Sequence, residues 1–163
     1  IGKNVILNSG VKIGQEGFGY IKDLDGNFIN FSHIGKVIIN DYVEIGANSC
    51  VDVGALSDTI IGENTKINNL CHIAHNVQIG KNCLIAAKVN ISGSTSIDND
   101  VYIGPNASII DGISIKNNAV IGMGAIVRKD VQEGCTIVPF GSFEKKNYAK
   151  LMRFLNQILK QKR

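Results

Sequence analysis

The chain has 163 residues, of which 44% are hydrophobic and 19% charged, and its net charge is +3. This composition suits one folded domain, contains no apolar run near the roughly 20 residues that span a bilayer, and begins without a signal-peptide pattern. We therefore expect a cytoplasmic protein with no integral membrane segment and no nucleic-acid partner.

An aliphatic residue recurs at every sixth position through most of the chain. The spacing appears at Ile1, Leu7 and Ile13, returns at Ile39, Ile45 and Val51, and is then unbroken at Ile61, Ile67, Ile73, Ile79, Ile85, Ile91, Ile97, Ile103, Ile109, Ile115, Ile121 and Val127. A helix requires apolar residues three or four apart, and hairpin strands require strict alternation between irregular turns. A fixed period of six instead predicts a parallel β-helix, a coil with three flat sides that each hold one short strand.

The repeat also predicts the inner surface and the corners of this coil. The residue two places before the aliphatic one is small or slim in nearly every repeat, so each repeat offers one large and one small inward side chain. In several repeats a glycine directly follows the aliphatic residue, and we expect it to allow a tight corner. These glycines are Gly62, Gly80, Gly104 and Gly122. Because the chain is already in register at Ile1 and lacks an initial Met, we expect that an N-terminal part precedes it.

Two segments interrupt the period. Residues 14–33 contain aromatic and charged residues and an Asp25-Gly26 pair, which predicts a loop or hairpin extending out of the coil. Residues 52–60 shift the register by a smaller amount. Loops inserted into a rigid scaffold commonly carry binding residues, and Phe18 and Tyr20 offer flat apolar rings to a ligand. The alternative is that both segments are surface excursions, with the aromatic rings packing the insertion onto the coil.

The four cysteines are Cys50, Cys71, Cys83 and Cys135, and none forms a CxxC pair. Cys71 and Cys83 occupy the small inward position of the repeat, so we interpret them as packing residues in a reducing compartment. The pattern favours neither a disulfide framework nor a zinc site.

The end of the chain differs from the repeats. The last twenty residues hold seven basic residues and one acid, and apolar residues recur there at helical spacing. We predict that residues 1–141 form the β-helix and residues 142–163 a basic amphipathic helix, which caps the coil or packs against neighbouring copies. Its basic face is either a solvated surface or a docking site for an acidic partner, such as acyl carrier protein or the phosphates of a nucleotide or coenzyme A.

Two histidines, His72 and His75, lie three residues apart in the stretch "CHIAHNVQIG". A zinc site needs three or four converging ligands, and the remaining histidine, His33, is far away along the chain, so we predict no metal. General-base catalysis requires only one histidine in a groove with a neighbour to orient it.

The stretches "IGQEGFGY", "VEIGANSCVDVGALSDTIIGENTKINNLCHIAHNVQIG" and "ISGSTSI" resemble, in order and spacing, the UDP-3-O-acylglucosamine N-acyltransferases of lipid A synthesis. The likeness runs from about Ile1 to about Gly112. The closing stretch "AVIGMGAIVRKDVQEGCTIV" is similar to acetyl-coenzyme A-dependent sugar acetyltransferases. The resemblance implies a left-handed β-helix and a homotrimer with clefts between neighbouring coils. The sequence departs from the family at Val53, where an arginine is usual, and at Gly112, where a histidine is usual.

The resemblance also implies roles for individual residues. His75 would be the general base that takes a proton from a sugar amine, and Gly93 would offer its backbone N–H to the oxyanion. Asn76 would hold the substrate or shape the corner, and His72 and Asp52 would contact the substrate. Phe18 and Tyr20 would complete the substrate site.

The sequence therefore predicts an N-acyltransferase of lipid A or surface polysaccharide synthesis. It would move an acyl group from a thioester of acyl carrier protein or coenzyme A to the amine of a nucleotide-linked amino sugar, without a metal or other cofactor. One alternative is an acetyl-coenzyme A-dependent sugar N- or O-acetyltransferase. An alternative of another class is a noncatalytic β-helical scaffold.

Overall fold

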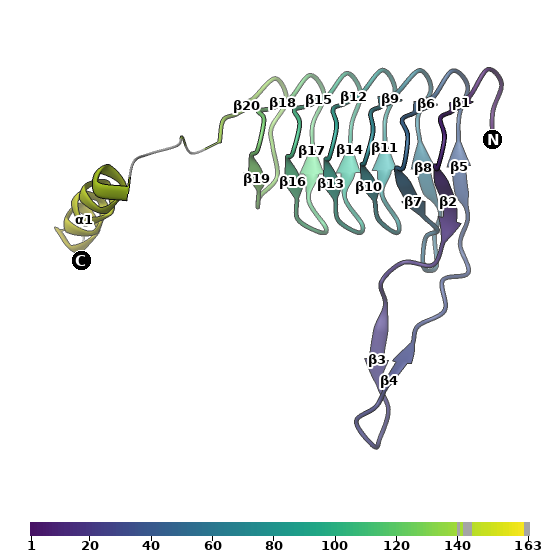
Figure 1. Ribbon diagram of the computed structural model, residues 1–163, viewed down its shortest axis with the longest axis horizontal. Helices are drawn as coiled ribbons and strands as arrows, with labels where there is room; N and C mark the ends of the chain where they lie inside the picture. The colour runs from purple at the N-terminus through teal and green to yellow at the C-terminus, as the bar shows by residue number, and fades with distance from the viewer. Residues whose placement is uncertain (140, 142–144, 162–163) are drawn as a thin grey trace.

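The computed structural model describes residues 1–139, 141 and 145–161. Within these residues the chain winds into a stack of three-sided coils, and a long arm leaves the stack near its N-terminal end (Figure 1). Each side of the stack is a parallel sheet, and the strands of a sheet come from successive coils. The fold class predicted from the period of six, a parallel β-helix followed by one helix, is confirmed.

The three sheets have seven, six and five strands within the described residues. The seven-stranded face consists of β1 (Ile6–Leu7), β6 (Glu44–Ile45), β9 (Lys66–Ile67), β12 (Leu84–Ile85), β15 (Tyr102–Ile103), β18 (Val120–Ile121) and β20 (Thr136–Ile137). The six-stranded face consists of β2 (Lys12–Gln15), β7 (Cys50–Asp52), β10 (His72–Ile73), β13 (Asn90–Ile91), β16 (Ser108–Ile109) and β19 (Ile126–Val127). The five-stranded face consists of β5 (Val37–Ile39), β8 (Thr59–Ile61), β11 (Gln78–Ile79), β14 (Ser96–Ile97) and β17 (Ser114–Ile115).

From Ile39 to Val127 the large aliphatic residue of each repeat is buried inside the coil, whereas Ile1 and Leu7 of the first coil are exposed. Ile73, Ile79 and Ile85 end strands on three successive faces and are 0%, 3% and 2% exposed. Each pairs with the equivalent residue of the next coil, as Ile73 does with Ile91, so the core is a set of stacked isoleucines. Burying such side chains is worth about 1.5–3 kcal/mol each, which explains why the period of six is kept so strictly.

The small inward positions complete this core. Cys71 and Cys83 are 2% and 0% exposed, and their Sγ atoms each lie 3.1 Å from a backbone carbonyl oxygen, that of Ala86 and that of Asp98 respectively. Burial raises the pKa of both thiols. The interpretation of these two cysteines as packing residues is confirmed.

The corners are built differently from the prediction. The backbone adopts a positive φ at the third residue after the aliphatic one, usually an asparagine, as at Asn64 (59°), Asn76 (62°) and Asn82 (57°). Asparagine tolerates this conformation better than most residues. Gly62 has no positive φ, but a Cβ there would lie 2.3 Å from the carbonyl oxygen of Gly80 in the next coil. At Gly62 glycine is therefore needed for close stacking against the next coil, and not for the turn itself.

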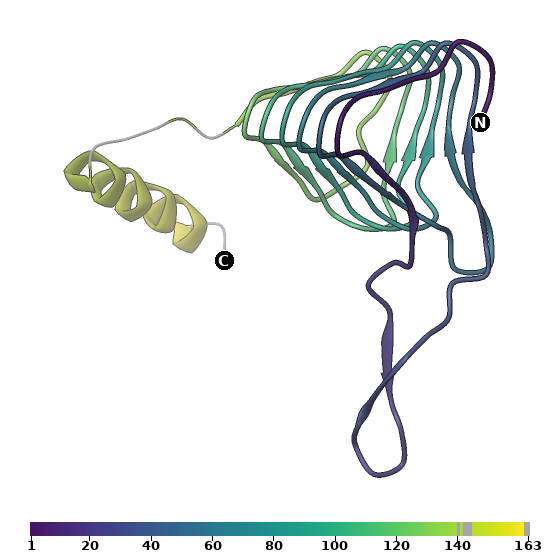
Figure 2. The ribbon, with the colours of Figure 1, turned by 45° about the vertical axis from the view of Figure 1, so that its right-hand side comes forward.

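Both interruptions fall at the same corner of the coil. The first separates β2 from β5 and the second separates β7 from β8, so each occupies the passage from the six-stranded to the five-stranded face. We call this edge, formed by residues 16–36, 53–58, 74–77 and 92–95, the histidine corner. The first interruption forms the arm visible in Figure 2.

The arm is a hairpin of β3 (Tyr20–Lys22) and β4 (Phe28–Asn30), which pair antiparallel. Its turn is organised by Asp23, whose Oδ1 accepts hydrogen bonds from the backbone N–H groups of Asp25 and Asn27, with Gly26 at a positive φ of 86°. The predicted hairpin is thus present, and its turn includes the Asp25-Gly26 pair.

Helix α1 (Lys145–Gln161) lies beyond the last coil and apart from it in both ribbon views (Figures 1 and 2). It does not cover the end of the coil, so the expectation that it acts as a cap is not met in the single chain, while packing against neighbouring copies stays a prediction. Residues 142–144 and 162–163 of the predicted helical segment lie outside the described residues. Across the described part of the chain, no helix combines the length and apolar character required to cross a membrane.

Candidate active site

His75 lies in the histidine corner, directly after β10, and is half-buried. Its Nδ1 is 3.0 Å from Oδ1 of the neighbouring Asn76. The same Oδ1 accepts a hydrogen bond from the backbone N–H of Ala55, while Nδ2 of Asn76 donates to the carbonyl oxygen and the hydroxyl of Ser57. Residues of the second interruption, which belong to the preceding coil, therefore hold the side chain of Asn76 in place.

These contacts determine the tautomer of His75. The carbonyl oxygen of Ser57 only accepts and the N–H of Ala55 only donates, so the amide of Asn76 has one consistent orientation and presents its oxygen to His75. Nδ1 of His75 must then carry a hydrogen. In the neutral imidazole Nε2 keeps its lone pair, which is the arrangement a general base requires.

Gly93 packs directly against this imidazole from the next coil. A Cβ at Gly93 would lie 2.5 Å from Cε1 and 2.7 Å from Nε2 of His75, so any other residue would displace the ring. The N–H of Gly93 donates no hydrogen bond to the described part of the protein, whereas the N–H of Ser94 donates to the carbonyl oxygen of His75. A free N–H beside Nε2 could bind an oxyanion.

His33 also lies at this site, which sequence reasoning missed. The His33 and His75 ring centroids are 5.2 Å apart with planes at 66°, and His33 is only 8% exposed. The arm returns to the coil at His33 after β4, and this loop closure joins residues that are distant in sequence. No pattern in the sequence signalled the contact, because His33 lies outside the repeat register. Among the described residues no group of three or more metal-ligating side chains is found.

His72 belongs to a separate cluster on the six-stranded face. Its Nε2 lies 2.9 Å from Oδ2 of Asp52, which is buried, and its Nδ1 lies 3.2 Å from Oδ1 of Asn90. The hydrogen bond to Asp52 is the main cause that raises the pKa of His72. His72 shows no hydrogen bond or ring contact with His75 in the described structure.

Four of the five residues predicted to bind the substrate line one pocket, whereas Asn76 lies beside His75 at the histidine corner. The lining of the pocket consists of Gln15, Glu16, Gly17, Phe18, Tyr20, Cys50, Asp52 and His72. Phe18 and Tyr20 are in edge contact, with ring centroids 5.2 Å apart, and their exposed surfaces continue into an apolar hollow shared with Phe28. The arm supplies the aromatic side of this pocket and the six-stranded face supplies the polar side.

Gly17 joins this pocket to the histidine corner. It lines the pocket, and a Cβ at Gly17 would lie 2.8 Å from Nε2 of His33 and 2.9 Å from Cδ2 of His75. Glycine at this position thus lets the arm approach both imidazoles. A ligand in the aromatic pocket would lie next to the edge that holds His75 and Gly93.

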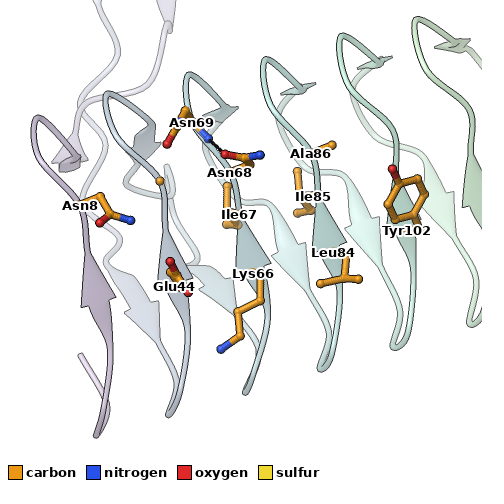
Figure 3. Close-up of a pocket in the computed structure, with 11 residues that line it drawn as sticks. Asn8, Glu44, Lys66, Ile67, Asn68, Asn69, Leu84, Ile85, Ala86 and Tyr102 are labelled. Carbon is orange, nitrogen blue, oxygen red and sulfur yellow. Dashed lines mark hydrogen bonds between the residues drawn. The ribbon is translucent and has the colours of Figure 1, made fainter.

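Another groove lies on the seven-stranded face (Figure 3). Lys66, Leu84 and Tyr102 project from successive strands along it, beside Glu44. It is lined by none of the predicted site residues, so the predicted site and this groove are separate features of the coil.

The repeats match a known family model. The model described as bacterial transferase hexapeptide, with six repeats, matches residues 58–93 and again residues 94–129. The two matches cover 72 of the 163 residues and agree with the period of six and with the stacked strands.

Part of the chain also matches curated sequence relatives. The chain is 56% identical over 77 residues to the UDP-3-O-acylglucosamine N-acyltransferase of Sinorhizobium fredii and 54% identical over 77 residues to that of Rhizobium meliloti. Each match covers 47% of this chain but 22% of the relative. The chain therefore matches less than a quarter of the length of these relatives.

Solved structures agree in fold. The UDP-N-acetylglucosamine acyltransferase of Francisella novicida superposes with a TM-score of 0.74 at 21% identity, covering 83% of this chain and 48% of that one. The corresponding Arabidopsis enzyme gives a TM-score of 0.67 at 22% identity, covering 81% of this chain and 52% of that one. At this identity the likeness concerns the fold alone.

Proposed function

We propose that the protein is an N-acyltransferase that transfers an acyl group from a thioester to the amine of a nucleotide-linked amino sugar. The observation that carries the proposal is the geometry around His75. Asn76 holds its Nδ1, Gly93 packs against its ring, and neither its Nε2 nor the N–H of Gly93 has a hydrogen-bond partner among the described residues. The partial sequence match to N-acyltransferases supports the amine as the acceptor group.

In the proposed reaction the lone pair of the amine attacks the thioester carbonyl carbon. Nε2 of His75 takes one proton from the amine, and the carbonyl π electrons move to the oxygen, where the N–H of Gly93 stabilises the negative charge. When the tetrahedral intermediate collapses, the carbon–sulfur bond breaks and the thiolate takes the proton from His75. An oxyanion donor typically contributes about 10²- to 10³-fold in rate, and a positioned base about 10²- to 10⁴-fold.

The aromatic pocket is the proposed acceptor site. Phe18 and Tyr20 offer two flat apolar rings for a base or a pyranose face, and the Asp52–His72 pair offers polar groups for hydroxyls. Glu16 and Asp52 make the polar side acidic, so we place sugar hydroxyls, and not phosphates, next to Asp52. Gly17 then leads from this pocket to His75.

Acyl carrier protein and coenzyme A thioesters are both proposed donors, and no cofactor is required. A cytoplasmic homotrimer and a role in lipid A or surface polysaccharide synthesis form part of the proposal, on the basis of the partial match to N-acyltransferases. An acetyl-coenzyme A-dependent sugar acetyltransferase would share the same His75 chemistry and would differ in the donor.

The test is acyl transfer to UDP-linked 2- and 3-amino sugars, with acetyl-coenzyme A and 3-hydroxyacyl carrier protein supplied in parallel. We expect an amide product with at least one donor, and the faster donor assigns the branch. Phe18→Ala is expected to raise KM for the acceptor about tenfold or more with a smaller change in kcat, because it removes an apolar contact worth about 1–3 kcal/mol. Absence of amide product with every pair would favour the noncatalytic scaffold.

A further inference from the structure

We propose that His33 is a specificity-determining residue that makes the site select amine acceptors over hydroxyl acceptors. The inference rests on the proposed acyl transfer and assigns a role to a residue that the transfer chemistry itself does not require. The observation behind it is a second imidazole nitrogen, fixed as a hydrogen-bond acceptor, next to the proposed base.

The tautomer of His33 is determined by its backbone contact. Nδ1 lies 2.8 Å from the carbonyl oxygen of Phe31, and because a carbonyl oxygen can only accept, Nδ1 carries the hydrogen. Nε2 of the neutral ring then keeps its lone pair. Nε2 has no hydrogen-bond partner among the described residues. It is still accessible to solvent, because every fully buried side-chain nitrogen or oxygen of the described chain has a hydrogen-bond partner.

The surrounding residues hold the His33 ring in place beside His75. It is 8% exposed, and its ring makes edge contacts with Phe31, at 5.9 Å between centroids, and with His75, at 5.2 Å. Gly17 and Gly19 both leave room for it, because a Cβ at either position would lie 2.8 Å from a ring atom of His33. Two glycines of the arm therefore keep this ring beside His75.

The two imidazoles together match the two hydrogens of an amine. Nε2 of His75 removes one N–H proton during attack. The other N–H remains on the nitrogen and becomes the amide hydrogen, and Nε2 of His33 accepts a hydrogen bond from it throughout the step. A hydroxyl group has only one hydrogen, which His75 takes. The lone pair of His33 would then face an oxygen lone pair without a partner.

Such an arrangement discriminates strongly. A site that hydrogen-bonds a substrate N–H or O–H rejects the analogue that lacks it, because the bound analogue excludes water and leaves the polar group of the protein unpaired. Packing alone would predict no such discrimination. An apolar ring at position 33 would support His75 equally well for both acceptors.

The experiment compares two UDP-sugars that differ only in an amine or a hydroxyl at the reacting carbon, using the donor that the wild type prefers. We expect His33→Phe, which keeps a ring beside His75, to lower kcat/KM for the amine about 10- to 100-fold, the size expected when a hydrogen bond of a buried group is lost. The rate with the hydroxyl sugar should stay within about threefold or rise. His33→Gln, which offers an acceptor oxygen, should recover part of the amine preference.

Leu24→Ala is the control, because Leu24 lies fully exposed at the tip of the same arm and should leave both rates unchanged. An equal loss with both acceptors in His33→Phe, or an unchanged ratio of the two rates, would overturn the specificity role and leave the proposed acyl transfer intact. If the wild type acylates neither sugar with any donor, the proposed function fails and the role of His33 fails with it.

Discussion

Two corners of the same coil have the same repeat but opposite hydrogen-bonding behaviour. The polar corner, residues 62–65, 80–83, 98–101 and 116–119, joins the five-stranded to the seven-stranded face. There Oδ1 of Asn99 accepts from the N–H of Lys81, and Oδ1 of Asn117 accepts from the N–H of Asn99. At the equivalent positions the histidine corner has His75 and Gly93, and within the described part of the chain the N–H of Gly93 has no acceptor.

The difference shows how a uniform scaffold can carry a local site. In the polar corner Asn99 and Asn117 each accept a hydrogen bond from a backbone N–H of the coil before them. In the histidine corner a glycine replaces the asparagine, and two interruptions of the repeat bring in Ser57 and His33 from other coils. These unpaired groups can be tested against the equivalent groups of the polar corner.

The largest expected effect is on catalysis. His75→Ala should lower kcat for amide formation about 10²- to 10⁴-fold, because it removes the positioned base. Lys81→Ala changes the equivalent residue of the polar corner, which is exposed and pairs only with Glu63 on the surface, and it should keep wild-type activity. Equal activity of the two variants would mean that the histidine corner is no more functional than the polar corner.

A smaller loss is expected from Gly93→Ala. The added Cβ would lie 2.5 Å from Cε1 of His75, so the imidazole must move, and kcat should fall about 10²-fold. The melting temperature should change little, since a ring edge can yield. Asn99→Ala, at the equivalent position of the polar corner, removes a backbone cap and should affect only stability. A Gly93→Ala variant with full activity would contradict the proposed packing of base against glycine.

The stability of the protein should depend more on Asn76 of the histidine corner than on Asn82 of the polar corner. Asn76 and Asn82 share a positive φ, so replacing either with alanine carries the same backbone cost. Asn76→Ala should nevertheless lower the free energy of unfolding by about 1–3 kcal/mol more, because Asn76 bonds Ala55 and Ser57 while Asn82 accepts a single bond from exposed Asn64. Urea unfolding of both variants measures the difference. Equal losses would show that the Asn76 network adds no stability.

The smallest effect concerns pH. The pKa of folded His72 is raised above its ordinary value of 6.5, chiefly by the hydrogen bond to Asp52. The pair therefore contributes its full stability below pH 6.5 and loses it as pH rises through the higher folded-state pKa. Because the His72 side chain is 46% exposed, the contribution is below about 1 kcal/mol. The fall in melting temperature from pH 6 to pH 8.5 should shrink in His72→Gln, and an identical fall would argue against the pair.

The sequence predicted the repeating coil well. It predicted incompletely the places where segments distant in sequence come into contact. The period of six identified the strands and the buried isoleucines, because burial of one residue per strand is a local requirement. It misassigned the corner glycines, since close stacking against the next coil is a contact between coils and leaves no local signal. It grouped Phe18, Tyr20, Asp52 and His72 as substrate residues, and the structure brings them into one pocket, although their roles stay predictions.

His33 shows the limit most clearly. The sequence gives no sign that His33 meets His75, because separation along the chain says nothing about where an inserted arm returns. The sequence by itself determined the coil, its core and the candidate residues of the repeat, since each depends on a pattern that recurs within six residues. Only the tertiary structure decided which residues meet at the histidine corner. Those contacts depend on stacking between coils and on the path of the arm, which place residues from four separate segments around one imidazole.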